Sequence, residues 1–411
     1  MNDKDHALAG EAATSISETI KQNAITNNGD GNVVMQDITA RDITINIASG
    51  LPPEVKQKKE ELKARVQSLA DNLSVLKEQI APAEIPADFE PPSDPAYSKI
   101  KWRKLLQALQ HKGCILFVGP EIAINEQGNS LHREFYKVLT EDFDDIEYLE
   151  QEGFFTPESD EEILYDVLEY YSKDFPTQNK IGRKLLEQFA QIPFDLILSL
   201  CPDDTMRRIF EDYDLEHRFL FYDGSKQEID AAENTTVIYN VLGNAADNGR
   251  YIFTHEQFYQ YLNKIIIPSA IKKKIQDASH FLFIGFDFDK WYNRLLLFIL
   301  DFEQKRSGGH RLIVGNKKIK EDIEKFIEKQ FNITFVDNEY SQFIEWLSLN
   351  AAQEGLLRNL NQVFVQNNFR ALKYISIRVT DDDKLEDLLK MEELTTAIDQ
   401  KIEQFKKRIQ N

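Results

Sequence analysis

The chain has 411 residues, with 49 Lys and Arg against 69 Asp and Glu and a formal net charge of −20. This length exceeds what one hydrophobic core usually covers, so we expect one large domain with appendages. The acidic balance, without a basic run, argues against direct nucleic-acid binding. No apolar run approaches the roughly 20 residues of a membrane span and no signal peptide opens the chain, which predicts a cytoplasmic location without membrane contact.

The first 50 residues combine a polar stretch with a strand-like pattern. NNGDGN at 27–32 predicts a turn, and Ile43, Ile45 and Ile47 alternate with polar residues as on a strand with one buried face. We therefore expect a flexible segment with a β-hairpin over 1–50. Because an isolated hairpin is marginal in water, its apolar face needs a partner, either this chain's own domain or other copies of the protein.

Residues 51–98 and 350–411 form helical flanks in this interpretation. Apolar residues at alternating spacings of four and three predict amphipathic helices in both flanks; they are Leu62, Val66, Leu69, Leu73, Leu76 and Ile80 in the first, and Met391, Leu394, Ile398, Ile402, Phe405 and Ile409 in the second. The first helix is expected either to lie on the main domain or to join a coiled coil, and the second to pack against it within or between chains. Five prolines at 81–95 predict a stiff linker.

Between these flanks, residues 99–349 alternate strand-like and helix-like runs. Short apolar runs are CILFV at 114–118, LILS at 196–199, TVIYN at 236–240, HFLFI at 280–284, RLIVG at 311–315 and ITFVD at 333–337. Helical spacing fills an insert at 131–192. Such alternation predicts an α/β domain with a Rossmann-like parallel sheet and helices on both faces.

No metal site is expected from the sequence. The two cysteines, Cys114 and Cys201, lie in apolar runs and cannot form a four-cysteine zinc site, so both are interpreted as small core residues. Cys201 is not expected to act as a nucleophile, because no histidine is near it in sequence and neighbouring carboxylates raise a thiol pKa. The acidic-aromatic run at 210–224 lacks the spacing of an EF-hand and is interpreted as a helix surface.

Small or polar residues follow four of the predicted strands. Gly119 follows the first, Cys201 lies just beyond the second, Gly243 beyond the third and Gly285 beyond the fourth. Ligands of an open parallel sheet bind beyond the carboxyl ends of its strands. A glycine there lets the backbone approach a phosphate, and a following helix start offers free N–H groups.

The order of these four segments, from 112 to 349, resembles that of the bacterial sirtuin-like domain family of immune-effector type. The resemblance implies a fold that binds NAD or ADP-ribose. It implies a cofactor cleft formed by Gly119, Pro120, Glu121, Ser199, Cys201, Asp203, Gly243, Gly285 and Phe286. Two cysteines exclude the four-cysteine zinc ribbon of sirtuin deacylases.

The motifs depart from the family pattern at the residues that carry its chemistry. Pro120 and Glu121 replace the rest of a glycine-rich turn, which removes a donor and adds a negative charge where a pyrophosphate would lie. Cys201 stands at the asparagine position and Leu242 at the histidine position, so the amide contact and the general base are lost.

Displaced residues are the alternative source of catalysis. Asn240 and Asn244 flank the lost histidine, and His255 follows Thr254 before a predicted helix. His255 is otherwise an ordinary surface residue, with Thr254 as the N-cap.

Three functions follow from these observations. The first is a catalytically inactive or altered binding or assembly module of a bacterial anti-phage defence system, acting as a homo-oligomer or with a partner protein. The second is an active NAD hydrolase that uses the displaced residues. The third is a structural partner without any ligand.

Overall fold

We analysed a computed structural model of the chain. It describes residues 39–47, 50–80, 91–142, 146–156, 160–225, 235–246, 251–264, 267–299, 310–315 and 319–410. The chain divides into two compact units, one of residues 1–84, 211–216 and 359–411 and one of residues 85–210 and 217–358. We call them the helical unit and the sheet unit.

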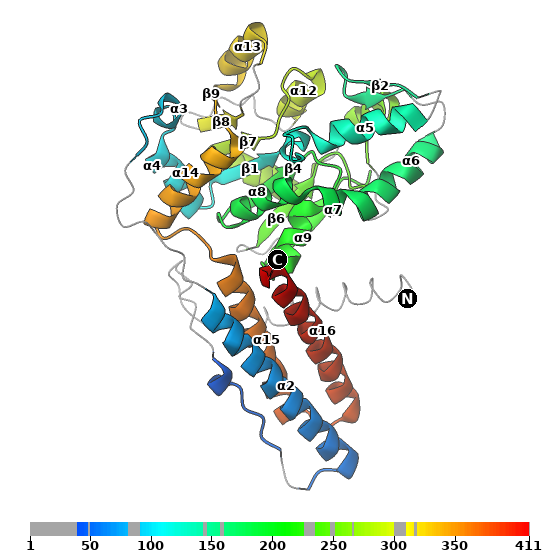
Figure 1. Ribbon diagram of the computed structural model, residues 1–411, viewed down its shortest axis with the longest axis vertical. Coiled ribbons are helices and arrows are strands. Elements are labelled where there is room, and N and C mark those ends of the chain that lie inside the picture. The colour runs from blue at the N-terminus through cyan, green and yellow to red at the C-terminus, as the bar shows by residue number, and fades with distance from the viewer. Residues whose placement is uncertain are drawn as a thin grey trace. The chain divides into compact units, whose positions relative to one another are not determined.

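The sheet unit contains a seven-stranded parallel sheet in the order β5-β6-β4-β1-β7-β8-β9 (Figure 1). Its strands are β1 (Cys114–Val118), β4 (Leu196–Ser199), β5 (His217–Phe221), β6 (Thr236–Asn240), β7 (His280–Ile284), β8 (His310–Val314) and β9 (Ile333–Val336). The four predicted strands at the centre are buried along their whole length, as expected for strands covered on both faces. The predicted Rossmann-like fold is confirmed.

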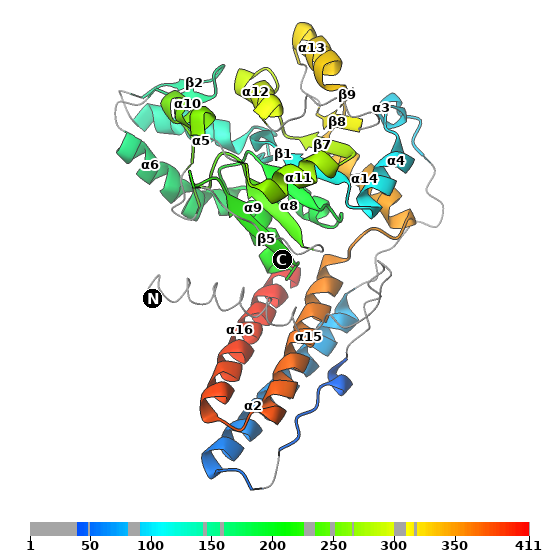
Figure 2. The same ribbon diagram turned by 180° about the vertical axis from the view of Figure 1, so that it is seen from behind.

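Helices lie on both faces of this sheet (Figures 1 and 2). One face packs its apolar side chains against α10 (His255–Lys264), α11 (Ser269–Asp277), α12 (Trp291–Ile299) and α13 (Glu321–Phe331). The other carries α4 (Trp102–Gln110), α8 (Lys180–Ala190) and α14 (Tyr340–Gln353), of which α14 contacts the other two. The remaining helices of the sheet unit are α3 (Pro95–Ser98), η2 (Pro120–Ile122), α5 (Leu131–Asp142), α6 (Asp160–Glu169), the π-helical turn η3 (Tyr170–Asp174), α7 (Phe175–Gln178) and α9 (Thr205–Asp212).

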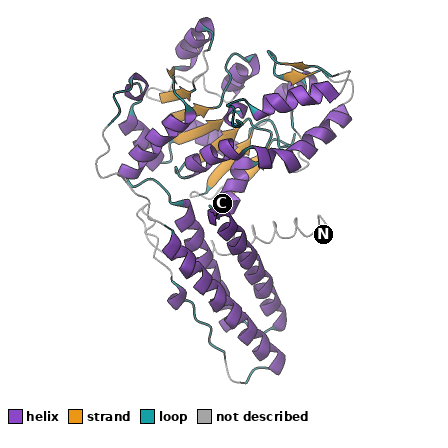
Figure 3. Cartoon of the chain, viewed as in Figure 1, coloured by secondary structure: helices purple, strands orange, loops and turns teal. Residues whose placement is uncertain are grey.

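The insert after β1 is helical, as predicted, and also contains a small antiparallel pair of strands, β2 (Tyr148–Leu149) and β3 (Phe154–Phe155) (Figure 3). Strand β5 was missed by the sequence analysis, which interpreted 210–224 as a helix surface. Its side chains are only partly buried because β5 is the edge of the sheet, so its pattern lacks the apolar run of the central strands.

The helical unit contains three long helices, α2 (Pro53–Gln79), α15 (Leu360–Asp381) and α16 (Leu385–Gln410) (Figure 1). Helix α2 packs against both of the other helices. The sequence left open whether the two heptad-spaced helices pack within one chain or between chains, and in this structure they pack within one chain. The shared seam includes Val66 and Leu73 of α2 and Ile402 and Phe405 of α16, each fully buried.

The predicted hairpin is not formed by residues 39–47, the part of it for which the structure gives a conformation. This segment holds the 3-10 turn η1 (Ala40–Asp42) and then extends without strand pairing. Ile43 and Ile45 are buried, as their alternation predicted, and Ser376 of α15 donates a hydrogen bond to the Thr44 carbonyl at 2.7 Å. The apolar face therefore packs on helices of its own unit. The predicted turn at 27–32 and most of the linker at 81–95 lie outside the described residues.

Candidate functional site

The candidate site lies at the carboxyl edge of the sheet. The chain places β4, β5 and β6 on one side of β1 and β7, β8 and β9 on the other. In open α/β sheets the ligand crevice lies where the strand order reverses in this way. Gly119 follows β1 and Gly285 follows β7, so the two glycines lie beside each other at this point.

Gly119 and Gly285 are in direct backbone contact. A Cβ atom built on Gly119 would lie 2.1 Å from the Gly285 carbonyl oxygen, and one on Gly285 would lie 2.7 Å from the Gly119 oxygen. Gly285 also has a φ of +69°, in the left-handed region. Both positions therefore require glycine for the packing of one backbone on the other.

The N–H groups that follow β1 are already bonded. Pro120 has no N–H group. The Glu121 N–H donates to the Gly285 carbonyl at 3.0 Å, and the Ile122 N–H donates to the Gly119 carbonyl at 3.3 Å. The segment forms the short 3-10 turn η2 in place of a long helix. The groups that bind phosphate in a nucleotide-binding turn are thus used within the protein.

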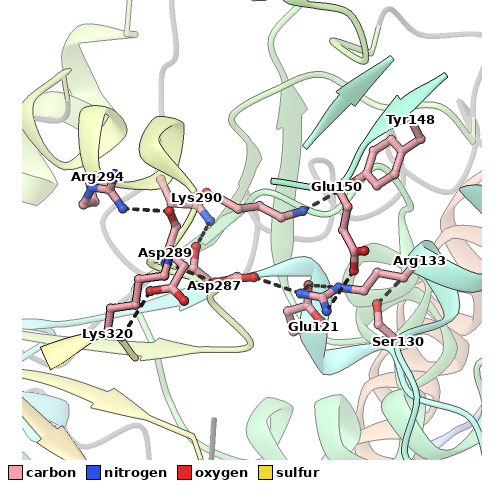
Figure 4. A network of polar contacts seen from close by, with 11 residues as sticks. Glu121, Ser130, Arg133, Tyr148, Glu150, Asp287, Asp289, Lys290, Arg294 and Lys320 are labelled. Carbon is pink, nitrogen blue, oxygen red and sulfur yellow. Dashed lines mark hydrogen bonds and ion pairs between the residues drawn. The ribbon is translucent and has the colours of Figure 1, made fainter. Parts of the chain in front are cut away.

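Acidic and basic side chains form a network over this turn (Figure 4). The Arg133 guanidinium lies 3.0 Å from a Glu121 carboxylate oxygen and 2.8 Å from Asp287, and 3.6 Å from Glu150. Asp287 is 7% exposed, and the Arg133 guanidinium is one of the groups that stabilise its buried charge. Glu121 therefore faces Arg133, and two carboxylates occupy the region beside the turn.

Beside this network lies a cavity of about 30 Å³, with Leu242 and four tyrosines in its wall. The tyrosines are Tyr136, Tyr148, Tyr251 and Tyr292. Burial raises the pKa of each of their hydroxyl groups, so these groups keep their protons. Lys290 also lines the cavity and donates to the Tyr148 hydroxyl at 3.1 Å. Its burial lowers the pKa of the ammonium.

The loop after β4 holds Ser199, Cys201 and Asp203 in place through its own hydrogen bonds. The Cys201 N–H donates to the Ser199 hydroxyl at 3.0 Å, and the Thr205 N–H donates to Asp203 Oδ1 at 2.8 Å. The Asn240 amide donates to the carbonyls of Asp203 at 3.0 Å and of Cys201 at 3.4 Å. Asn240, a candidate for displaced catalysis, thus holds the loop.

Asn244 and His255, the other two candidates for displaced catalysis, have different environments. Asn244 is fully buried, and its Oδ1 accepts from the Ala246 N–H at 3.4 Å. His255 begins α10, with its side chain 30% exposed and Nε2 at 3.6 Å from Glu152. The Gln257 N–H donates to the Thr254 hydroxyl at 3.2 Å, which confirms Thr254 as the N-cap.

Two further residues of the predicted cofactor cleft are Gly243 and Phe286. Gly243 has a φ of +100°, and the ring of Phe286 stacks on that of Phe288 at 5.4 Å between centroids.

His132, like Arg133 and Asp287, lies at this edge and was missed by the sequence analysis. It lies near the start of α5, and its Nε2 is 3.7 Å from Asp203 Oδ2. His132, Cys201 and Asp203 each direct a ligating atom into a group whose atoms lie within 4.8 Å of one another. The chain distance between His132 and the other two leaves no spacing signal, so the nearness of a histidine to Cys201 could be seen only in the fold.

The titration of this group follows from its burial. Burial raises the pKa of the Cys201 thiol, with the charge of Asp203 adding to the effect, as expected from sequence. It raises the pKa of Asp203 to about 6 and lowers the pKa of His132 to about 3. A buried thiol with a raised pKa is a poor nucleophile.

Part of the sheet unit matches a known family of domains. Residues 196–336 match the family model of the SIR2-like domain. The match runs from the first residue of β4 to the last of β9 and supports a sirtuin-like family for the sheet unit. No curated protein matches the chain. Over the described part of the chain, none of the helices is both long and apolar enough to cross a bilayer.

Proposed function

We propose that this chain uses a sirtuin-like fold as a binding or assembly module and does not cleave NAD. The observation that carries the proposal is the crevice at the switch between β1 and β7, where the backbones of Gly119 and Gly285 touch. A pyrophosphate in the family's position would need donors that Glu121 and Ile122 have already given to neighbouring carbonyls. It would also meet the carboxylates of Glu121 and Asp287.

The residues at the family's catalytic positions also argue against cleavage of NAD. Leu242 is 3% exposed in the cavity wall and has no proton to exchange. Cys201 is 5% exposed and its thiol is protonated at neutral pH. A cavity of about 30 Å³ is far below the 300–1,000 Å³ of ordinary ligand pockets. These residues do not fit NAD or ADP-ribose in the family's pose.

The first test is incubation of the purified chain with NAD, followed by chromatography of the nicotinamide released. We expect no release above a protein-free control. Release by the wild-type chain that is lost in His255→Gln or Asn244→Ala would establish the alternative function, an NAD hydrolase with displaced residues. Release that survives both changes would equally contradict the proposal.

The second test is titration calorimetry with NAD and with ADP-ribose. We expect no heat of binding at low micromolar ligand, because the backbone contact between Gly119 and Gly285 occupies the crevice. Binding of either ligand would show that the crevice opens in solution and would contradict the closed state.

The assembly part of the proposal rests on the helical unit. Its long helices carry exposed large apolar side chains, namely Val75, Ile377, Leu385, Leu389 and Ile409. We propose that a second copy of the chain covers them, within a bacterial defence system as the family resemblance implies. Light scattering after size exclusion should give a mass above that of one chain. Leu385→Glu with Leu389→Glu should lower it, and a monomeric wild-type chain would contradict the assembly role.

A further inference from the structure

Three potential metal ligands converge beneath the cavity of the sheet unit. His132, Cys201 and Asp203 are 2%, 5% and 7% exposed. They offer one nitrogen, one sulfur and one oxygen atom, all within 4.8 Å of one another. A buried polar atom normally has a hydrogen-bond partner, and His132 Nε2 is buried without one among the described residues, so this atom of the group needs an explanation.

The imidazole of His132 is held with one nitrogen aimed into this group. Its Nδ1 lies 2.6 Å from the Tyr171 hydroxyl, and its ring stacks on Phe175 at 4.9 Å. Its Nε2 is buried and has no hydrogen-bond partner among the residues that the structure describes. A metal-bound histidine has this arrangement, in which the second ring nitrogen is fixed by an outer partner and the first is left for the ion.

The other two ligands are fixed by the loop that follows β4. Asp203 Oδ1 accepts from the Thr205 N–H at 2.8 Å, and its Oδ2 is the oxygen nearest His132. The Asn240 amide binds the carbonyls of both Cys201 and Asp203, so the two side chains keep their relative position. The group is therefore arranged before any ligand arrives.

We propose that His132 Nε2, Cys201 Sγ and Asp203 Oδ2 form a three-ligand site for a divalent transition metal, with Zn²⁺ the ion it fits best. A thiolate and an imidazole select borderline-soft ions, and three protein ligands leave a fourth position for water. His132 also lines the cavity of about 30 Å³, which has room for such a water.

The charges of the proposed ligands also fit a divalent ion such as Zn²⁺. Binding displaces the thiol proton of Cys201, and any proton on Asp203, to solvent, and neither the ion nor the protein changes oxidation state. One thiolate and one carboxylate then balance the two positive charges of the ion, which leaves the buried site neutral. The site goes beyond the proposed function, because it needs neither NAD nor a second chain.

The test is metal binding to the full chain after chelation and dialysis. Elemental analysis should find one zinc ion per chain after addition of Zn²⁺. With Co²⁺ as the probe, absorption from a thiolate bound to cobalt should appear. Cys201→Ser and His132→Gln should each weaken binding by more than about a hundredfold. Each removes a direct ligand, so its effect should exceed the largest loss seen on removal of an outer partner. Tyr171→Phe, which removes such a partner, should weaken it by about 10–100-fold.

Cys114→Ser is the matched control, because Cys114 is a buried cysteine of β1 outside the group and should leave binding unchanged. A chain that takes up no zinc overturns the site, and so does Cys201→Ser that binds as tightly as the wild type. Should that variant fail to fold, the wild-type cobalt spectrum decides. Thiolate absorption supports the site, and its absence, or its loss in Cys114→Ser, overturns it.

Discussion

Two glycines decide the shape of the ligand edge at the scale of single residues. Gly119 has an ordinary backbone conformation, so its requirement for glycine is purely steric. In a nucleotide-binding turn the missing side chain makes room for a phosphate. Here it makes room for the carbonyl of Gly285. The same residue type at the same place in the fold thus serves packing.

We expect Gly119→Ala to destabilise the sheet unit by about 2–3 kcal/mol, because its methyl group would overlap the Gly285 carbonyl and force the two strands apart. Chemical denaturation measures the change. Gly315→Ala is the matched control. It also follows a strand of the sheet, and its Cβ would meet its nearest atom, the Tyr340 hydroxyl, at an ordinary 3.6 Å. Equal stability of the two variants would show that the Gly119 contact is not present in solution.

Arg133 carries the charge balance of the same edge. We expect Arg133→Met to cost about 2–3 kcal/mol, because Asp287 and Glu121 would lose the guanidinium that lies 2.8 Å and 3.0 Å from them. The loss should shrink when Asp287→Asn is combined with it, since the buried charge is then gone. Lys325→Met, which breaks an exposed pair with Glu321 on α13, should change stability by less than about 0.5 kcal/mol. Denaturant midpoints of the variants give the comparison, and additive losses from Arg133→Met and Asp287→Asn would argue against the coupling.

At the scale of elements, the amino ends of β7 and β8 bring two histidines together. The rings of His280 and His310 lie 5.3 Å apart. Burial, the neighbouring histidine and Lys104 lower the pKa of His280 to about 4. Burial and the charges of Lys101 and Lys104 lower the pKa of His310 as well. Both rings are therefore neutral in the folded protein at pH values where the same two histidines are protonated in the unfolded chain.

The sign of the pH effect follows from this difference. Below about pH 6.5 the unfolded chain binds a proton at His280 that the folded chain binds only near pH 4, so stability falls as the pH drops through this window. We expect His280→Gln to remove about 1–2 kcal/mol of this loss, after allowance for solvent screening. Urea denaturation at pH 7 and pH 5 measures it, with exposed His111→Gln as the control. An unchanged slope in His280→Gln would contradict the assignment.

At the scale of the whole molecule, the chain combines a sheet unit with a helical unit whose parts are far apart in sequence. The helical unit joins α2 to α15 and α16, and it also includes residues 211–216. Within it Lys401 of α16 lies 2.8 Å from Asp214, and Phe405 stacks on Phe364 at 4.0 Å. Its stability therefore depends on contacts between distant segments of the chain.

We expect Phe405→Ala to destabilise the helical unit by about 3–5 kcal/mol, because both stacked rings are buried and the cavity cannot fill. Hydrogen exchange should accelerate throughout α2, α15 and α16. Gln404→Ala, at the neighbouring position of α16 with an exposed side chain, should leave exchange in these helices near the wild-type rate. Faster exchange confined to α16 would mean that the three helices do not unfold together.

The sequence by itself determined six of the seven strands of the parallel sheet, the helical insert and the two heptad-spaced helices. Those features depend on local periodicity, which burial on one or both faces imposes directly on neighbouring residues. It also placed Gly119 and Gly285 at strand ends. The sequence did not reveal the edge strand β5, because a half-exposed strand has no continuous apolar run. The strand expected at Ile43 and Ile45 instead packs on a helix, since alternation reports a buried face and does not name its partner.

Only the tertiary structure decided what the ligand edge contains. The contact between Gly119 and Gly285, the pairing of Arg133 with Asp287, and the approach of His132 to Cys201 all join segments separated by at least a helix or a strand. Such meetings leave no spacing pattern in a single chain, because they depend on the order in which strands enter the sheet. Strand order is a property of the whole fold, and it sets which side chains share an edge.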